Sequence, residues 1–132
     1  MFLKGDKLER DTLDWGTIAT VSGPEVNHAR DIVTLHVDLK PGKGHNFHRH
    51  PQQEEVIYVL KGKIEQWVNE EMKILEPGDA AFIGAEVVHA SFNIGNENAE
   101  VLAILGPAVG ATGYEVEEVA DKQPWKSLRK TS

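Results

Sequence analysis

The sequence predicts an all-β protein, folded as an antiparallel sandwich or a small barrel with little helix. Gly- and Pro-containing turns recur between short apolar segments, about every 8 to 12 residues, as in sheets built of hairpins. Several of these segments alternate apolar and polar side chains, which is the pattern of a strand with one buried face. No stretch repeats its apolar residues with the period of an amphipathic helix, so helices of the kind that join parallel strands are not expected.

The clearest strand lies at residues 32–39, where every second side chain is aliphatic. One face of this segment would carry Val33, Leu35, Val37 and Leu39. Six further strands are expected at residues 56–60, 64–68, 72–75, 80–83, 87–92 and 101–105. The segment 114–120 fits either a helical turn or an edge strand.

The length of the chain indicates one domain. Its 132 residues fall within the range of about 100 to 150 residues that is commonest for compact domains. We expect residues 1–132 to form a single domain with its core at about residues 30–106. The N-terminal arm, residues 1–20, and the C-terminal tail, residues 107–132, are charged and loosely patterned. We expect both to lie over the domain or to be partly frayed.

The composition excludes several classes of function. The formal charge of −7, from 14 Lys and Arg against 21 Asp and Glu, leaves no basic stripe for nucleic acid. The absence of cysteine excludes disulfides, thiolate nucleophiles, iron–sulfur clusters and cysteine-bound zinc. No apolar run reaches the roughly 18 to 20 residues that span a membrane, and the charged N-terminus lacks a signal-peptide pattern. We therefore expect a cytoplasmic protein that contacts neither nucleic acid nor membrane.

Histidine is concentrated in one short segment. Three of the six histidines lie within residues 45–50. Because residues two apart in an extended chain share a face, His48 and His50 are expected to project together and His45 to the other side. After a short turn comes Glu55, which by the same alternation can face the pocket of His48 and His50.

These residues have a chemical interpretation and a structural one. Two imidazoles on one face and a nearby carboxylate, in a chain without cysteine, form a nitrogen and oxygen donor set. Such a set suits divalent iron, manganese, nickel, cobalt, copper or zinc. Histidines beside a turn are also common as solvated side chains. The residue pattern alone leaves both interpretations open.

The spacing resembles the sequence motifs of the cupin superfamily. The first motif, G-x5-H-x-H-x3,4-E-x6-G, has all its fixed positions filled, by Gly42, His48, His50, Glu55 and Gly62. The second motif, G-x5-P-x-G-x2-H-x3-N, is matched at Gly78, His89 and Asn93. Gly84 replaces its proline, and Glu86 replaces its middle glycine. The resemblance covers about residues 30–106 and is to the small, single-domain cupins.

The resemblance implies an antiparallel jelly-roll barrel, or double-stranded β-helix, of roughly six to eight strands. It also implies one divalent transition metal ion held by His48, His50, Glu55 and His89. The fourth of these residues lies far along the chain from the other three, so it would close the site across the barrel. A six-coordinate ion with four protein ligands would keep two positions for water, dioxygen or a chelating substrate.

The function that the resemblance implies is a metal-dependent enzyme, dioxygenase-like or isomerase- or lyase-like, that acts on a small, oxygen-rich chelating substrate. Glu55 would be the catalytic residue, changing between metal ligand and general base. The alternative is a non-catalytic cupin that binds or senses a small molecule. A third interpretation is that the ion mainly stabilises the barrel.

Other histidine, glutamine and aromatic residues have two interpretations, one functional and one structural. His45 would hydrogen-bond a carboxylate near the site or guard its entrance, or else be a solvated turn residue. His36 would line the barrel interior or face solvent, and Gln66 would reach the pocket or stay exposed. His28 is expected at the surface. The aromatic residues expected in packing or at interfaces are Trp15, Trp67, Trp125 and Tyr58.

The strand at residues 56–60 is apolar on both faces, which bears on quaternary structure. The face with Val56, Tyr58 and Leu60 is not the one that carries Glu55, so something else must cover it. The cover would be the N-terminal arm, with Phe2, Leu3 and Trp15, or a second subunit. We expect a homodimer, which is also the common state of small cupins.

Overall fold

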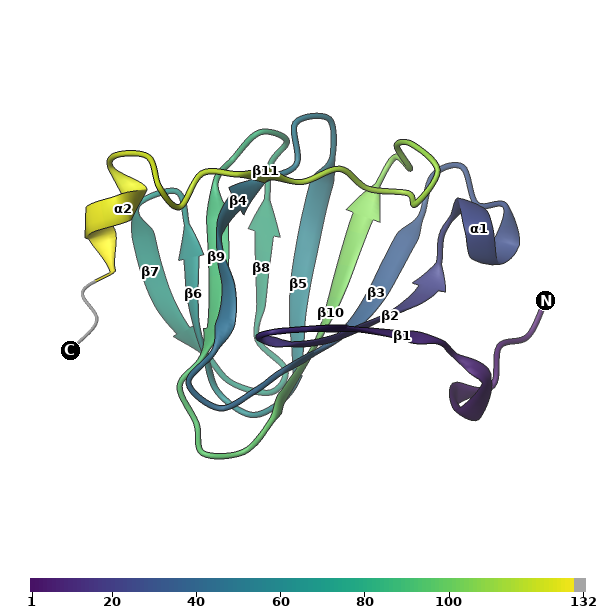
Figure 1. Ribbon diagram of the computed structural model, residues 1–132, viewed down its shortest axis with the longest axis horizontal. Helices are drawn as coiled ribbons and strands as arrows, with labels where there is room; N and C mark the ends of the chain where they lie inside the picture. Colours follow the sequence, from purple (N-terminus) through teal and green to yellow (C-terminus); the bar gives the residue numbers. More distant parts are fainter. Residues whose placement is uncertain (130–132) are drawn as a thin grey trace.

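The computed structural model describes residues 1–129, which form two antiparallel β-sheets that face each other as a jelly-roll barrel (Figure 1). The six-stranded sheet contains, in spatial order, β1 (Arg10–Leu13), β2 (Gly16–Ser22), β3 (Val33–Leu39), β10 (Ala99–Gly106), β5 (Glu54–Lys61) and β8 (Ala80–Ile83). The five-stranded sheet contains β11 (Glu117–Glu118), β4 (Gly44–Arg49), β9 (His89–Asn93), β6 (Ile64–Val68) and β7 (Glu71–Leu75). The all-β prediction is confirmed.

In the described part of the chain, helix is confined to three short segments. They are the 3₁₀ turn η1 (Gly5–Lys7), α1 (Pro24–Asn27) and α2 (Trp125–Leu128). Within residues 1–129, no helix is long and apolar enough to cross a membrane.

The seven strands expected from apolar patterning are all present, with ends that differ by no more than two residues from the expectation. Alternation gives the clearest result in β3, where four buried side chains alternate with three half-buried ones. The buried four are Val33, Leu35, Val37 and Leu39. They pack with the inward side chains of β5 and β10 into the main core.

The N-terminal segment differs from the expected arm because part of it is a strand of the sheet. Residues 10–22 form the hairpin of β1 and β2, and β2 pairs with β3 along most of its length. Ala19 is completely buried. A Cβ atom on Gly16 would lie 1.8 Å from the carbonyl oxygen of Asp38, so only glycine allows this close approach. The threonines and serine of β2 hid this strand from a search for apolar alternation.

The described part of the C-terminal tail crosses one end of the barrel (Figure 1). Its short strand β11 pairs with β4, so the segment expected to be a helical turn or an edge strand contains an edge strand. Beyond β11, Trp125 and Leu128 pack on a second apolar cluster that includes Phe47 and Phe92. The tail therefore adds a strand and a small core to the five-stranded sheet.

The outward face of β5 remains uncovered by the described chain. Tyr58 and Leu60 are 39% and 41% exposed, and Phe82 of the neighbouring edge strand β8 is 61% exposed. The proposed cover by the N-terminal segment is wrong, because Phe2 is itself 95% exposed and Trp15 lies on the inner side of the sheet. The expectation of a second subunit remains a prediction.

Candidate metal centre

The histidine-rich strand β4 lies beside β9 in the five-stranded sheet. His48 is opposite His89, and His45 is opposite Ser91. Between these two pairs β4 has one residue more than β9, which is a β-bulge. The bulge turns His45 to the same side as His48, and their rings stack with centroids 3.5 Å apart and planes 7° apart. The expectation that His45 faces the other side is therefore wrong.

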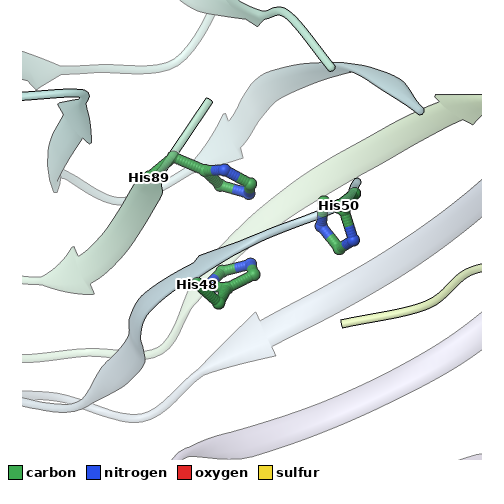
Figure 2. A group of neighbouring side chains, drawn as sticks. All are labelled: His48, His50 and His89. Atoms are coloured by element: carbon green, nitrogen blue, oxygen red, sulfur yellow. The ribbon is translucent and has the colours of Figure 1, made fainter. Parts of the chain in front are cut away.

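Three buried histidines converge inside the barrel, as Figure 2 shows. His48 belongs to β4, His50 follows the end of that strand, and His89 begins β9. Each offers a ring nitrogen, and these three atoms lie within 4.8 Å of one another. The direct pairing of β4 with β9 thus brings together His48 and His89, which are 41 positions apart along the chain.

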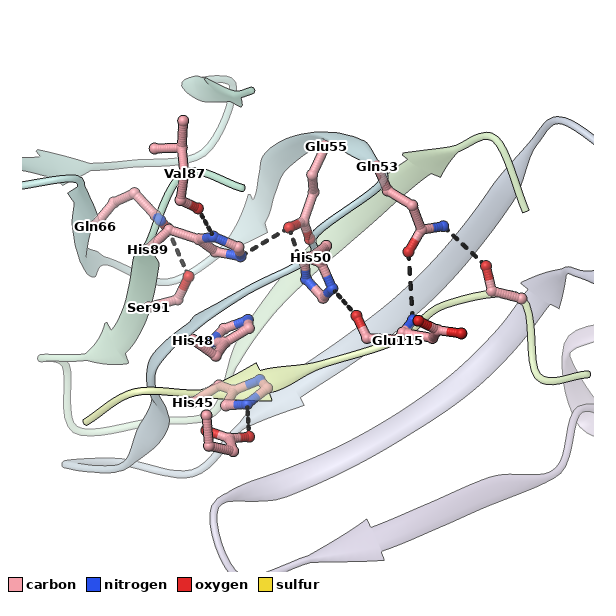
Figure 3. A network of polar contacts seen from close by, with 12 residues as sticks. His45, His48, His50, Gln53, Glu55, Gln66, Val87, His89, Ser91 and Glu115 are labelled. Atoms are coloured by element: carbon pink, nitrogen blue, oxygen red, sulfur yellow. Dashed lines mark hydrogen bonds and ion pairs between the residues drawn. The ribbon is translucent and has the colours of Figure 1, made fainter. Parts of the chain in front are cut away.

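The opposite nitrogen of each ring is fixed by the backbone. His48 Nδ1 donates to the carbonyl oxygen of Asn46 at 2.7 Å. His50 Nδ1 donates to the carbonyl of Glu115 at 2.7 Å, and His89 Nδ1 to that of Val87 at 3.1 Å (Figure 3). A carbonyl oxygen only accepts, so Nδ1 carries the proton, and in a neutral ring Nε2 is left with a free lone pair. This is the arrangement of a metal-binding histidine.

Glu55 reaches the histidines from the opposite sheet. Its Oε1 atom lies 2.8 Å from His89 Nε2 and 3.2 Å from His50 Nε2 (Figure 3). Burial acts to raise the pKa of this carboxyl group, but its contacts with His50 and His89 outweigh burial and lower the pKa to about 2. The group is therefore ionised at neutral pH.

Two atoms of this cluster lack the partner that burial requires. Glu55 Oε1 and His89 Nε2 are buried and have no hydrogen-bond partner among the described residues. When the His89 ring is neutral and its proton is on Nδ1, the two atoms face each other at 2.8 Å as lone pairs, and a proton on Nε2 or a metal cation between them removes the repulsion. Three imidazole nitrogens and one carboxylate oxygen fit a divalent transition metal ion.

The two histidines of the first motif experience different electrostatic environments. Burial, with the neighbouring His89 and His45, holds the pKa of His48 well below its usual value, so this ring is neutral at pH 7. Burial also lowers the pKa of His50, but contact with Glu55 outweighs it, and the net shift of that pKa is upward. Glu55 thus favours positive charge on the His50 side of the cluster.

The cluster opens onto a cavity of about 230 Å³ between the two sheets. At its mouth the ring of Trp15 stacks on that of His45, with centroids 5.2 Å apart, and His45 Nε2 lies 2.9 Å from Glu118 Oε1. His45 thus has the carboxylate partner that was one of its expected roles. Trp15, expected only to pack or to lie at an interface, lines the cavity as well.

The remaining histidines lie away from the cluster. His36 is on the outer side of β3, where its Nδ1 is 2.8 Å from Arg10 and its Nε2 is 3.5 Å from Glu100. His28 is exposed at the end of α1, as expected. Neither residue lines the cavity.

The other motif residues have structural roles. Asn93 is buried, and its amide donates to the carbonyls of Leu39 and Glu97, which fixes the turn after β9. Glu86, which replaces a motif glycine, is exposed with a φ of 67°, so this turn retains the left-handed backbone that glycine favours. Gln66 is buried inside the barrel and accepts a hydrogen bond from Ser91 of the cavity lining.

Sequence reasoning missed Gln53. This side chain is buried, and its Nε2 donates to the carbonyls of Pro107 at 2.7 Å and Gly113 at 2.9 Å. Its Oε1 accepts from the backbone of Glu115, the residue whose carbonyl orients His50. Gln53 thus ties the C-terminal tail to the site. Nothing distinguishes it in the sequence from its exposed neighbour Gln52.

Comparison with known proteins identifies the family. The family model described as "Cupin domain" matches residues 35–105, which is more than half of the chain and includes all four motif residues of the cluster. The protein therefore belongs to the cupin family. One curated relative is the polyketide synthase CurC of Streptomyces cyaneus, 30% identical over 88 residues. The match covers 63% of this chain and 57% of the relative, so the chain spans little more than half of that protein.

Solved structures support the same fold. KdgF from Halomonas sp. superposes with a TM-score of 0.74 at 20% identity, covering 83% of this chain and 96% of that one. The oxalate decarboxylase of Bacillus subtilis, a protein with Mn(II) centres, superposes with a TM-score of 0.67 at 23% identity. That match covers 73% of this chain and 27% of the decarboxylase. At these identities the likeness concerns the fold alone.

The role of Gln53 is open to direct test. Gln53→Met keeps the size of the side chain but leaves the carbonyls of Pro107 and Gly113 without their donor. We expect a loss of about 1–3 kcal/mol in the free energy of unfolding, measured by urea denaturation. Gln52→Met is the control and should stay within about 0.5 kcal/mol of the wild type. Equal unfolding midpoints for the two variants would contradict the role assigned to Gln53.

Proposed function

We propose that this protein is a metal-dependent cupin enzyme whose ion is held by His48, His50, His89 and Glu55. The observation that carries the proposal is the convergence of three inward-facing histidine nitrogens and a buried carboxylate on one cavity. The buried, unpartnered atoms of Glu55 and His89 support it further, because a bound cation would satisfy both.

The donor set is compatible with iron, manganese, nickel, cobalt, copper or zinc in the divalent state. The Mn(II) centres of the structurally similar oxalate decarboxylase make manganese the first ion to test. When bound, such an ion supplies a Lewis acid that polarises an oxygen of the substrate. A small molecule with two neighbouring oxygens is the kind of substrate that such a site would hold.

The residues around the ion would divide the remaining tasks. Glu55 is the buried carboxylate of the cavity lining and is the proposed proton acceptor, whereas Glu118 lies at the mouth and contacts His45. The Ser91 hydroxyl donates its hydrogen to Gln66, which leaves its oxygen as an acceptor toward the cavity. A dioxygenase-like reaction and an isomerase- or lyase-like proton transfer are both compatible with this arrangement.

Metal retention tests the ligand set. Protein purified without chelator is expected to contain about one equivalent of a divalent transition metal, measured by plasma mass spectrometry. His50→Ala and His89→Ala each remove one nitrogen donor, so we expect at least a tenfold loss of metal affinity. His28→Ala, in an exposed histidine, should retain the wild-type content. Full retention in both cavity variants would refute the site.

Turnover separates an enzyme from a binding protein. The metal-loaded protein is offered catechols, flavonols and β-diketones, and both oxygen uptake and hydrogen exchange with deuterated solvent are followed. We expect turnover of at least one class, reduced roughly 100-fold or more in Glu55→Gln because the proton acceptor is lost. Binding without turnover across the iron, manganese, nickel and copper forms would instead identify a non-catalytic binding or sensor cupin.

The proposal includes a homodimer that buries the outward face of β5, β8 and β10. Tyr58, Leu60, Phe82 and Ile104 are exposed apolar side chains of this face, which ends at the edge strand β8 of the described sheet. The wild type is expected near 29 kDa, roughly twice its chain mass of 14.6 kDa, in sedimentation equilibrium. Phe82→Glu should give the monomer mass. Met72→Glu, on the other sheet, should leave the dimer intact.

A further inference from the structure

We propose that the molecule bound by this site has an apolar body of one or two small rings behind its metal-binding oxygens, and that it is neither a phosphate ester nor a polycarboxylate. The inference deepens the proposed function and rests on it, because it concerns the substrate of the same centre.

Polar side chains are a minority of the cavity lining. The metal-binding cluster, His45, Ser91 and Glu118 supply the polar lining, and most of the other side chains that line the cavity are aliphatic or aromatic. A ligand that only chelated the ion would leave this apolar surface in contact with water. A ligand with an apolar body would remove it from water, which stabilises the complex by about 25 cal/mol per Å² buried.

The charge of the lining disfavours a second anionic group. No Lys or Arg within residues 1–129 lines the cavity, although these are the side chains that usually hold carboxylates and phosphates. Glu55 and Glu118 add negative charge instead. The ion would balance the negative charge of a chelating head. A phosphate or a further carboxylate on the body of the ligand would be buried without a positively charged partner.

One wall of the cavity provides the room for the body. On β10, Ala103 lies in register between Leu35 of β3 and Ile57 of β5. The next inward residue of β10, Leu105, is opposite Glu55. Ala103 is therefore the smallest side chain of this wall, and it is one inward position along β10 from the residue opposite Glu55. The side chains on the neighbouring strands, Leu35 and Ile57, are both larger. The recess at Ala103 is where the body would lie.

The volume limits the size of that body. A cavity of about 150 Å³ lined by apolar side chains holds benzene, and drug-sized ligands occupy pockets of about 300 Å³ or more. The cavity here measures about 230 Å³, between these two values. The rings of Trp15 and Tyr114 also line it, and flat ligands pack well against aromatic rings. One or two planar rings fit this volume and can pack against these two side chains.

Three hydroxamates that share one chelating head test the proposal in the metal-loaded protein by titration calorimetry. Benzohydroxamate is expected to bind at least tenfold more tightly than acetohydroxamate, because the ring buries apolar surface. A carboxylate in the para position, as in 4-carboxybenzohydroxamate, should weaken binding at least tenfold, since no cation receives it. Equal affinity for the methyl and phenyl compounds, or tighter binding of the carboxylated one, would overturn the proposal.

A substitution at Ala103 tests whether this residue is responsible for the preference for a ligand with an apolar body. Ala103→Leu fills the space and should weaken benzohydroxamate binding at least tenfold while leaving acetohydroxamate within about threefold. Leu102→Phe is the matched control, because Leu102 is adjacent on β10 and its side chain does not line the cavity. Should Ala103→Leu not fold, Leu35→Ala enlarges the same recess and should raise the affinity for 2-naphthohydroxamate. Unchanged affinities in the folded variants would contradict the assigned recess.

A metal-free measurement keeps this inference separate from the proposed function. In protein treated with chelator, toluene is expected to shift the methyl resonances of Ala103 and Leu35, and inorganic phosphate at the same concentration is not. If the protein binds no metal but toluene occupies the recess, the proposed function fails and the apolar preference holds. If metal binds but toluene leaves these resonances unmoved, the apolar preference fails alone.

Discussion

The structure depends on three hydrogen bonds from buried imidazoles to backbone carbonyls. They hold the Nδ1 protons of His48, His50 and His89 away from the centre, so that three lone pairs point at one another. Each carbonyl comes from a different segment: β4 itself, the C-terminal tail and the turn before β9. The bulge in β4, the anchoring of the tail by Gln53 and the pairing of β4 with β9 all serve this geometry.

Closure of the barrel brings the negatively charged Glu55 next to the three histidines. The histidines come from the five-stranded sheet, and Glu55 comes from β5 of the six-stranded sheet. A buried carboxylate is costly unless charge or hydrogen bonds compensate it. The contacts with His50 and His89 lower its pKa to about 2, so the group is ionised. The fold thus holds a negative charge beside three imidazole rings, where a proton on a ring or the proposed metal ion would balance it.

The sequence predicted features set by local alternation and missed those set by distant partners. The inward face of β3 follows from period-two patterning, and the spacing of His48, His50 and Glu55 predicted that these three side chains lie close together, as they do. The orientation of His45 depends on a bulge, which exists only relative to β9. The role of Gln53 depends on backbone carbonyls more than 50 residues away along the chain. The strand β2 was missed because its pairing with β3, and not its own apolar pattern, identifies it as a strand.

The cavity is built partly from residues within the family match and partly from segments outside it. His48, His50, Glu55 and His89 lie within residues 35–105, the part that the cupin family model matches. At the mouth, Trp15 comes from the N-terminal hairpin and Tyr114, Val116 and Glu118 from the C-terminal tail, all outside that match. The residues of the proposed metal site therefore lie in the part that matches the family, and the segments that frame the opening lie outside it. Selectivity for the body of the ligand then depends on the recess at Ala103 and on these two segments.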